Sequence, residues 1–332
     1  MNTKQEIVDA MNRENSGQAP PALFSQTGTY ALMEASGASW PEANYNEDAM
    51  IKLALQPSNM FGLATVRIPF DLTSEAERLG CEVFEGNHDS QPAVMNSPWR
   101  SDEILDPPDL MPVDEFLSEG RCSMYVRVAE RLSKEHPELF LTSSCVGPLE
   151  LACHMVGMEN FLMGLFTNPD PTMKWVEAMT PYSCEYAKAL SEVSDNLFVI
   201  TEGSEDVMDP DSFSTFAPYE SKVFASIKES FSVAHVCGTT ENVQNILAEL
   251  GCTALSVQCF GDPQSIVDRI GDKVVVVGGV DPIDVMMQGS PEDVINAAQK
   301  AAEAGYSVIT PECGVPPQTP NAKIEALSKY RE

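Results

Sequence analysis

A histidine and two cysteines stand at the ends of two apolar segments, where they could bind a soft metal ion together. His235 and Cys237 end the segment 231–237, and Cys313 ends the segment 309–313. Side chains two residues apart on a β-strand point to the same face, so His235 and Cys237 can reach one ion. One histidine and two cysteines with an open fourth position are typical of a catalytic zinc site. The alternative is that the three residues are unrelated, with ordinary buried thiols and a hydrogen-bonded imidazole.

These ligands need a sheet whose strand ends meet at one edge. Eight apolar segments have the character of strands, beginning near residues 22, 62, 139, 196, 231, 253, 273 and 306, and most precede a helical segment. The later ones are continuous apolar runs, as expected for strands buried on both faces. The pattern predicts an α/β fold, a (β/α)8 TIM barrel that spans residues 1–332 as a single domain. Its functional groups should lie at the C-terminal strand ends.

Further polar residues fall at the ends of these predicted strands. Arg67 could meet an anionic thiol there, and a salt bridge with Asp71 or Glu75 is the alternative. An ordinary hydrogen bond at the barrel rim is an alternative role for two of the acidic residues, Glu202 and Asp281. The candidates for contacting substrate or supporting the zinc ligands are Gln258, Gln26, Glu202, Asp71 and Asp281.

Two segments lie outside the repeating pattern. Residues 3–14 place Ile7, Val8 and Met11 on one face, which predicts an N-terminal amphipathic helix. After the second strand, residues 81–84 and 93–95 could pair as a hairpin, and residues 96–120 are rich in proline and acidic side chains. We expect an insertion at about residues 84–121 that lies near the barrel mouth.

The composition excludes several classes of partner. Lys and Arg total 20 and Asp and Glu total 50, which gives a formal net charge of −30. Such a surface repels nucleic acid and anionic membranes. The chain contains no apolar run approaching the ~20 residues of a membrane helix, and its first residues show no secretory signal. With nine cysteines, we expect a cytoplasmic protein with reduced thiols.

Several motifs together resemble a known family. They are QTGTY at 26–30, GASWPEA at 37–43, LGC at 79–81, HVCG at 235–238 and CGVPPQTP at 313–320. The chain resembles the uroporphyrinogen decarboxylase-like superfamily of TIM barrels, and within it the methylcobamide:coenzyme M methyltransferases of methylotrophic methanogenesis. That resemblance implies zinc bound by His235, Cys237 and Cys313. The decarboxylases carry arginine where Thr29 stands and histidine where Cys313 stands.

The resemblance implies zinc-dependent transfer of a methyl group from a methylated corrinoid to a small thiol such as coenzyme M. The corrinoid (methylcobamide) would be presented by a carrier protein, because the chain lacks the cobalamin-binding pattern D-x-H-x-x-G. Zinc would hold the thiol as the thiolate. Gln258 stands where the methyltransferases carry glutamate, which should leave the fourth zinc position open.

Three alternatives remain at this level. A first-step methyltransferase would move methyl from a thioether or aryl ether donor onto the corrinoid protein. A decarboxylase is a lesser alternative, which Asp71 keeps open because it fits an aspartate of that family. A zinc-binding scaffold without catalysis is the third.

Overall fold

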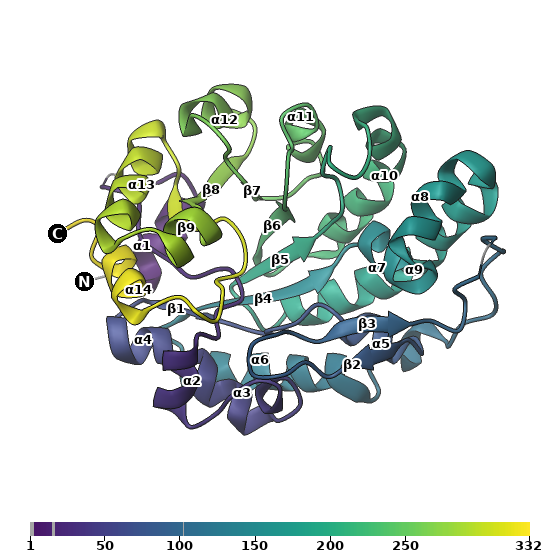
Figure 1. Cartoon of the computed structure of the whole chain (residues 1–332), viewed down its shortest axis with the longest axis horizontal. Helices are drawn as coiled ribbons and strands as arrows, with labels where there is room; N and C mark the ends of the chain where they lie inside the picture. The colour runs from purple at the N-terminus through teal and green to yellow at the C-terminus, as the bar shows by residue number, and fades with distance from the viewer. Residues whose placement is uncertain (1–2, 15–16, 102) are drawn as a thin grey trace.

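The computed structural model describes residues 3–14, 17–101 and 103–332. Seven parallel strands form a curled sheet in the order β1-β4-β5-β6-β7-β8-β9, and helices surround it (Figure 1). The strands are β1 Thr65–Arg67, β4 Phe140–Val146, β5 Asn196–Ile200, β6 Phe231–Val236, β7 Ala254–Val257, β8 Val275–Val280 and β9 Val308–Pro311. All seven C-terminal ends therefore face the same edge of the sheet.

The connecting segments are mostly helical, as right-handed crossovers between parallel strands require. The α-helices are α1 Lys4–Met11, α2 Tyr30–Ser36, α3 Glu47–Ala54, α4 Gln56–Phe61, α5 Ser74–Arg78, α6 Gly120–Glu135, α7 Pro148–Val156, α8 Met158–Thr167, α9 Pro169–Ser191, α10 Pro210–Ser226, α11 Gln244–Leu247, α12 Pro263–Ile270, α13 Pro291–Ala304 and α14 Asn321–Ser328. Two short 3-10 helices are η1 Glu42–Asn44 and η2 Val113–Glu115, and η3 Pro282–Gln288 is a π-helix. None of the helices in the described ranges combines the length and apolar character needed to span a bilayer.

The first of the eight predicted strands is wrong. The segment 22–26 makes only isolated parallel bridges at its two ends, to β9 and to the segment after β9. The N–H of Ala22 still donates to a carbonyl of β9 at 2.8 Å. The next two N–H groups bond side chains: Leu23 donates to Thr65 Oγ1 and Phe24 donates to Thr310 Oγ1, each over 3.1 Å. The Phe24 carbonyl accepts from Arg67 Nε at 2.8 Å. The segment lies between β9 and β1, but in its middle side chains replace the ladder that would define a strand.

Helix α1 lies at the N-terminal ends of the strands. Its Ile7, Ala10 and Met11 are buried in one cluster with inward-facing strand residues such as Phe140 and Phe198. Lys4 Nζ pairs with Asp195, just before β5, at 2.7 Å. Because this end of the sheet is filled by α1, the C-terminal strand ends are the edge that can receive a ligand.

The segment after β1 contains the hairpin β2 (Glu82–Phe84) and β3 (Ala93–Asn96), which pair antiparallel. His88 in the hairpin loop stacks on Tyr30, with ring centroids 5.0 Å apart. The segment from 97 to α6 runs across α9, where Trp99 packs against Trp175. The expected pairing of residues 81–84 with 93–95 is therefore present.

Candidate metal centre

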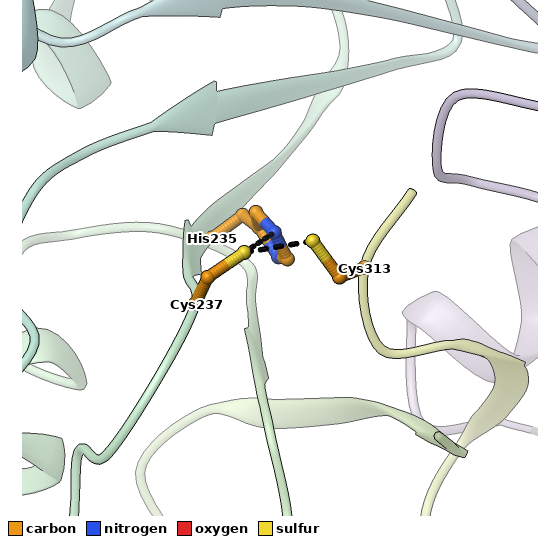
Figure 2. Close-up of side chains that lie close together, drawn as sticks. All are labelled: His235, Cys237 and Cys313. Atoms are coloured by element: carbon orange, nitrogen blue, oxygen red, sulfur yellow. Dashed lines mark hydrogen bonds between the residues drawn. The ribbon is translucent and has the colours of Figure 1, made fainter. Parts of the chain in front are cut away.

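The three predicted ligands converge at the C-terminal edge of the sheet (Figure 2). His235 lies on β6, Cys237 follows that strand, and Cys313 follows β9. The His235 Nε2 atom is 3.2 Å from Cys237 Sγ, and Cys237 Sγ is 2.8 Å from Cys313 Sγ. The three donor atoms all lie within 4.8 Å of one another. Segments 76 residues apart thus bring two thiols and an imidazole together.

Backbone geometry places Cys237. Gly238 has φ +82°, and a Cβ at that position would lie 2.5 Å from Ser204 Oγ and 2.6 Å from Asp206 Oδ2. The residue after the cysteine must therefore be glycine, for both conformation and space. Asp206 Oδ2 accepts from the Thr239 N–H at 2.8 Å. The loop after β5 thus holds the turn that carries Cys237.

The donor set fits a zinc ion with one position open. Two thiolates at the usual Zn–S bond length of ~2.3 Å in a tetrahedral site lie about 3.8 Å apart, so the present sulfur atoms would separate by about 1 Å to admit the ion. His235 Nδ1 already bonds Ser256 Oγ at 3.0 Å, and Nε2 faces Cys237. Nε2 is therefore the nitrogen available to a metal. Two thiolates would neutralise the charge of a divalent ion.

The two thiols influence each other's ionisation. The pKa of Cys313 is lowered, chiefly because Cys237 donates a hydrogen bond to it, with His235 as a further cause. The pKa of Cys237 is raised by that same hydrogen bond and by burial. Cys237 is therefore the thiol of the pair that holds its proton more tightly. Since a bound metal requires both as thiolates, binding would release that proton.

Two of the other predicted residues border this centre. Gln258 Oε1 accepts from the Gly238 N–H at 2.6 Å, so the amide supports the turn after Cys237. The backbone carbonyl of Gln26 accepts from Val315 N at 2.8 Å, which ties residue 26 to the segment that follows Cys313.

Glu202 follows β5, and its charge is one of the influences that raise the pKa of Cys237. The pKa of Glu202 is itself raised to about 7, first by burial and then by the nearby carboxylate of Glu150. Glu202 can therefore exchange a proton near neutral pH beside the centre.

Two other predicted residues have partners elsewhere. Asp71 is buried and bonds Arg121 Nη1 at 2.7 Å and the Tyr125 hydroxyl at 2.5 Å. Asp281 Oδ1 accepts from two backbone N–H groups and caps the segment Pro282–Gln288. Arg67 bonds the carbonyl of Phe24 and the Ser144 hydroxyl rather than a carboxylate of Asp71 or Glu75. The salt bridge of Asp71 is with Arg121 instead.

A family profile described as Uroporphyrinogen decarboxylase (URO-D) matches residues 2–332. The chain belongs to the uroporphyrinogen decarboxylase family. It is 32% identical to the methylcobamide:CoM methyltransferase MtbA of Methanosarcina mazei, over 98% of this chain and 96% of that protein. It is 29% identical to MtaA of Methanosarcina barkeri, another methylcobamide:CoM methyltransferase, over 99% and 97% of the two chains.

A solved structure shares the fold of this uroporphyrinogen decarboxylase family member. It is described as a methyltransferase from Methanosarcina mazei, with a TM-score of 0.92 and 29% identity, and the match covers 100% of this chain and 98% of that one. The chain therefore shares its α/β fold with that methyltransferase.

A cavity of about 210 Å³ lies between the segments that follow β6 and β7 and the helices α11 and α12. Thr239, Gln258 and Phe260 line it, whereas none of the three ligand residues does. Gln258 is thus shared between the cavity wall and the turn that holds Cys237.

Sequence reasoning missed Ser256, which bonds the imidazole of His235. Its only sequence signal is its place two residues before Gln258, which puts both side chains on one face of β7. The pairing of His235 with Ser256 depends on the register of β6 against β7, which no local pattern encodes.

Proposed function

We propose that this protein is a zinc-dependent methyltransferase that moves a methyl group from a methylated corrinoid to coenzyme M. The observation that carries the proposal is the convergence of His235, Cys237 and Cys313 at one sheet edge, in a chain with near full-length similarity to methylcobamide:CoM methyltransferases. The corrinoid partner is a carrier protein that meets the C-terminal strand ends, in the cytoplasm.

The chain's own residues provide the setting for that reaction. When bound, zinc would lower the pKa of the substrate thiol and supply it as a thiolate nucleophile. Cys237 and Cys313 balance the charge of the ion, so one further thiolate leaves net negative charge and remains nucleophilic. The thiolate sulfur forms a bond to the methyl carbon, the cobalt–carbon bond breaks, and its electron pair stays on the corrinoid.

Three neighbouring residues have supporting roles in the proposal. Glu202, with its pKa raised to about 7, passes the thiol proton from the centre to solvent. Gln258, an uncharged amide engaged by Gly238, leaves the fourth metal position to substrate. Gln26 lies against the segment that follows Cys313 and borders the thiol. Asp71 and Asp281 act at a distance, through the framework that shapes the mouth.

The same proposal extends to the fold. The segment 22–26, between β9 and β1, fills the position of the eighth strand in a TIM barrel that forms a single domain. Helix α1 fills the N-terminal end of this barrel, and the segment from β2 to α6 is an insertion near its mouth.

Proton release on thiol binding tests the proposal. Coenzyme M should bind to the zinc-loaded protein with release of close to one proton below the pKa of the free thiol, because the metal takes the thiolate. Calorimetry in two buffers of different ionisation heat measures this number. Methylcobalamin should then transfer its methyl group to coenzyme M. The reaction can be measured anaerobically from the absorbance of the reduced corrinoid.

Two outcomes would overturn the proposal. Methyl transfer that continues undiminished after zinc is removed would exclude the metal-thiolate reaction. Binding of a methyl thioether or aryl ether without proton release, followed by methylation of the corrinoid, would instead identify a first-step methyltransferase.

A further inference from the structure

Strand β7 and the residue that follows it contribute none of the three predicted ligands, yet their side chains bond the imidazole on β6 and the turn just after β6. Ser256 Oγ, on β7, is 3.0 Å from Nδ1 of His235. Two residues later, Gln258 Oε1 is 2.6 Å from the N–H of Gly238, the residue after Cys237. We propose that Ser256 and Gln258 set the zinc affinity of the centre by positioning His235 and Cys237. The inference rests on the proposed function, because it concerns the same zinc site.

The register of the sheet brings Ser256 to the imidazole. His235 and Ser256 are direct partners across β6 and β7. Ser256 is 1% exposed and His235 is 6% exposed, so water competes little for their hydrogen bond. A buried hydrogen bond of this kind fixes the ring orientation that an exposed histidine would sample freely.

Metal binding dictates the direction of this hydrogen bond. A nitrogen that ligates an ion must offer a lone pair, so with Nε2 facing the thiols the proton resides on Nδ1. Nδ1–H then donates to the Ser256 hydroxyl. Removing such a partner from a metal-binding histidine typically weakens metal affinity 10–100-fold.

Gln258 acts on the second ligand through the backbone. The Gly238 N–H would otherwise be an unpaired donor in a tight turn with φ +82°. The amide oxygen of Gln258, just after β7, accepts a hydrogen bond from this N–H. The next N–H, that of Thr239, donates to Asp206 in the loop after β5. Cys237 is therefore held between two neighbouring strands, and loss of Gln258 frees one side of its turn.

The test compares zinc affinities by competition with a chromophoric chelator. Ser256→Ala should bind zinc about 10–100-fold more weakly than the unsubstituted chain. Ser256→Thr keeps the hydroxyl and should stay within about three-fold. Ser143→Ala is the matched control, because it removes another buried strand hydroxyl, whose partner is Ser194 at 2.7 Å. Its zinc affinity should be unchanged.

Gln258→Leu provides a second, independent variant. It should weaken zinc binding several-fold and broaden the visible spectrum of the cobalt(II)-substituted protein, because Cys237 samples more than one geometry. If Ser256→Ala does not fold, Gln258→Leu carries the test alone. Wild-type zinc affinity in folded Ser256→Ala and Gln258→Leu would overturn the inference and leave the proposed function standing. Weakened zinc binding in both variants, with no methyl transfer by the unsubstituted chain, would support the inference and refute the proposed function.

Discussion

Two groups of polar residues occupy the same edge of the sheet but differ in the chemistry of their partners. After β1, Asp71 is buried and ion-paired with Arg121. At the ends of β6 and β9, His235, Cys237 and Cys313 turn their donor atoms toward one another. We refer to these as the Asp71 network and the metal centre.

The contrast shows that a strand-end position does not by itself make a site. Arg121 donates to Asp71 and to Thr73 Oγ1, and its guanidinium also lies over the Tyr45 ring, 4.7 Å from the centroid. A buried acid that is this well paired serves the framework. The metal centre instead brings two sulfur atoms and an imidazole nitrogen together, and their lone pairs are those that a soft metal ion can take. The two groups should therefore respond oppositely to substitution.

The largest effect is expected from removing a thiol of the metal centre. Cys237→Ala and Cys313→Ala should each reduce bound zinc from about one per chain to less than a tenth, since two protein ligands rarely hold the ion. Methyl transfer from methylcobalamin should fall by at least about thirty-fold at pH 7, because a free thiol with a pKa of about 8.5 is only about 3% thiolate there. Elemental analysis and the absorbance assay measure both quantities.

Cys259→Ala is the control for that experiment. Cys259 is a free thiol on the segment after β7 that lies outside the three-residue group. It should retain full zinc. Full zinc in both Cys237→Ala and Cys313→Ala would remove the distinction between the metal centre and the rest of the edge.

The second effect should appear in stability rather than in metal content. Arg121→Met leaves the buried carboxylate of Asp71 without its cation, and breaking such a pair costs about 3–5 kcal/mol of unfolding free energy. Zinc content should not change. Arg127→Met is a matched control, because the pair of Arg127 with Glu47 is exposed and should contribute less than about 1 kcal/mol. Urea denaturation compares the three proteins, and zinc loss in folded Arg121→Met would contradict the separation.

Much of this contrast depends on information that the sequence does not carry locally. The two-residue period of a strand predicts that His235 and Cys237 share a face, and apolar runs predict the seven strands of the sheet. The partner of Asp71 is 50 residues away on α6, and the partner of His235 is fixed by strand register. No local pattern distinguishes a strand-end acid with a distant arginine from one that faces a ligand.

The prediction of a strand at residues 22–26 is wrong for a related reason. Its apolar residues suit a strand, and it does lie in the gap between β9 and β1. Two of its central N–H groups, however, bond the hydroxyls of Thr65 and Thr310, which only the folded chain brings near.

A third, smaller effect tests the turn that joins the metal centre to its surroundings. Gly238→Ala imposes a side chain at positive φ, which costs about 1–2 kcal/mol, and its Cβ would contact Ser204 and Asp206. The shifts of neighbouring atoms that make room for the Cβ should cost a further ~1–3 kcal/mol of stability. Zinc affinity should fall with stability, because Cys237 precedes the turn. Gly251→Ala is the control, since it has φ +91° but open space around a Cβ. Equal stability losses in the two variants would show that crowding at residue 238 is unimportant.

The smallest effect concerns a buried acid on the framework side of the comparison. Glu220, on α10, is fully buried, and its Oε1 accepts from the Leu149 N–H at 3.0 Å at the start of α7. Burial is the main cause that raises the pKa of Glu220 from 4.5 to about 7. The folded chain therefore holds this proton over a pH range in which the unfolded chain has lost it. The resulting stabilisation is complete below about pH 4.5 and is lost as the pH rises through about 7.

Glu220→Gln should remove that dependence. The amide keeps an acceptor for Leu149 but has no proton to lose, so the difference in unfolding free energy between variant and unsubstituted chain should shift by about 2–3 kcal/mol between pH 5 and 8, in favour of the variant at the higher pH. The comparison must be a difference between the two proteins, because burial also raises the pKa of Glu75 and Glu312 and these contribute equally to both. Any constant cost of placing an amide at residue 220 cancels between the two pH values. If the difference in unfolding free energy between the two proteins stays constant across this range, Glu220 is ionised in the folded chain. The framework would then tolerate a buried carboxylate that has no cationic partner.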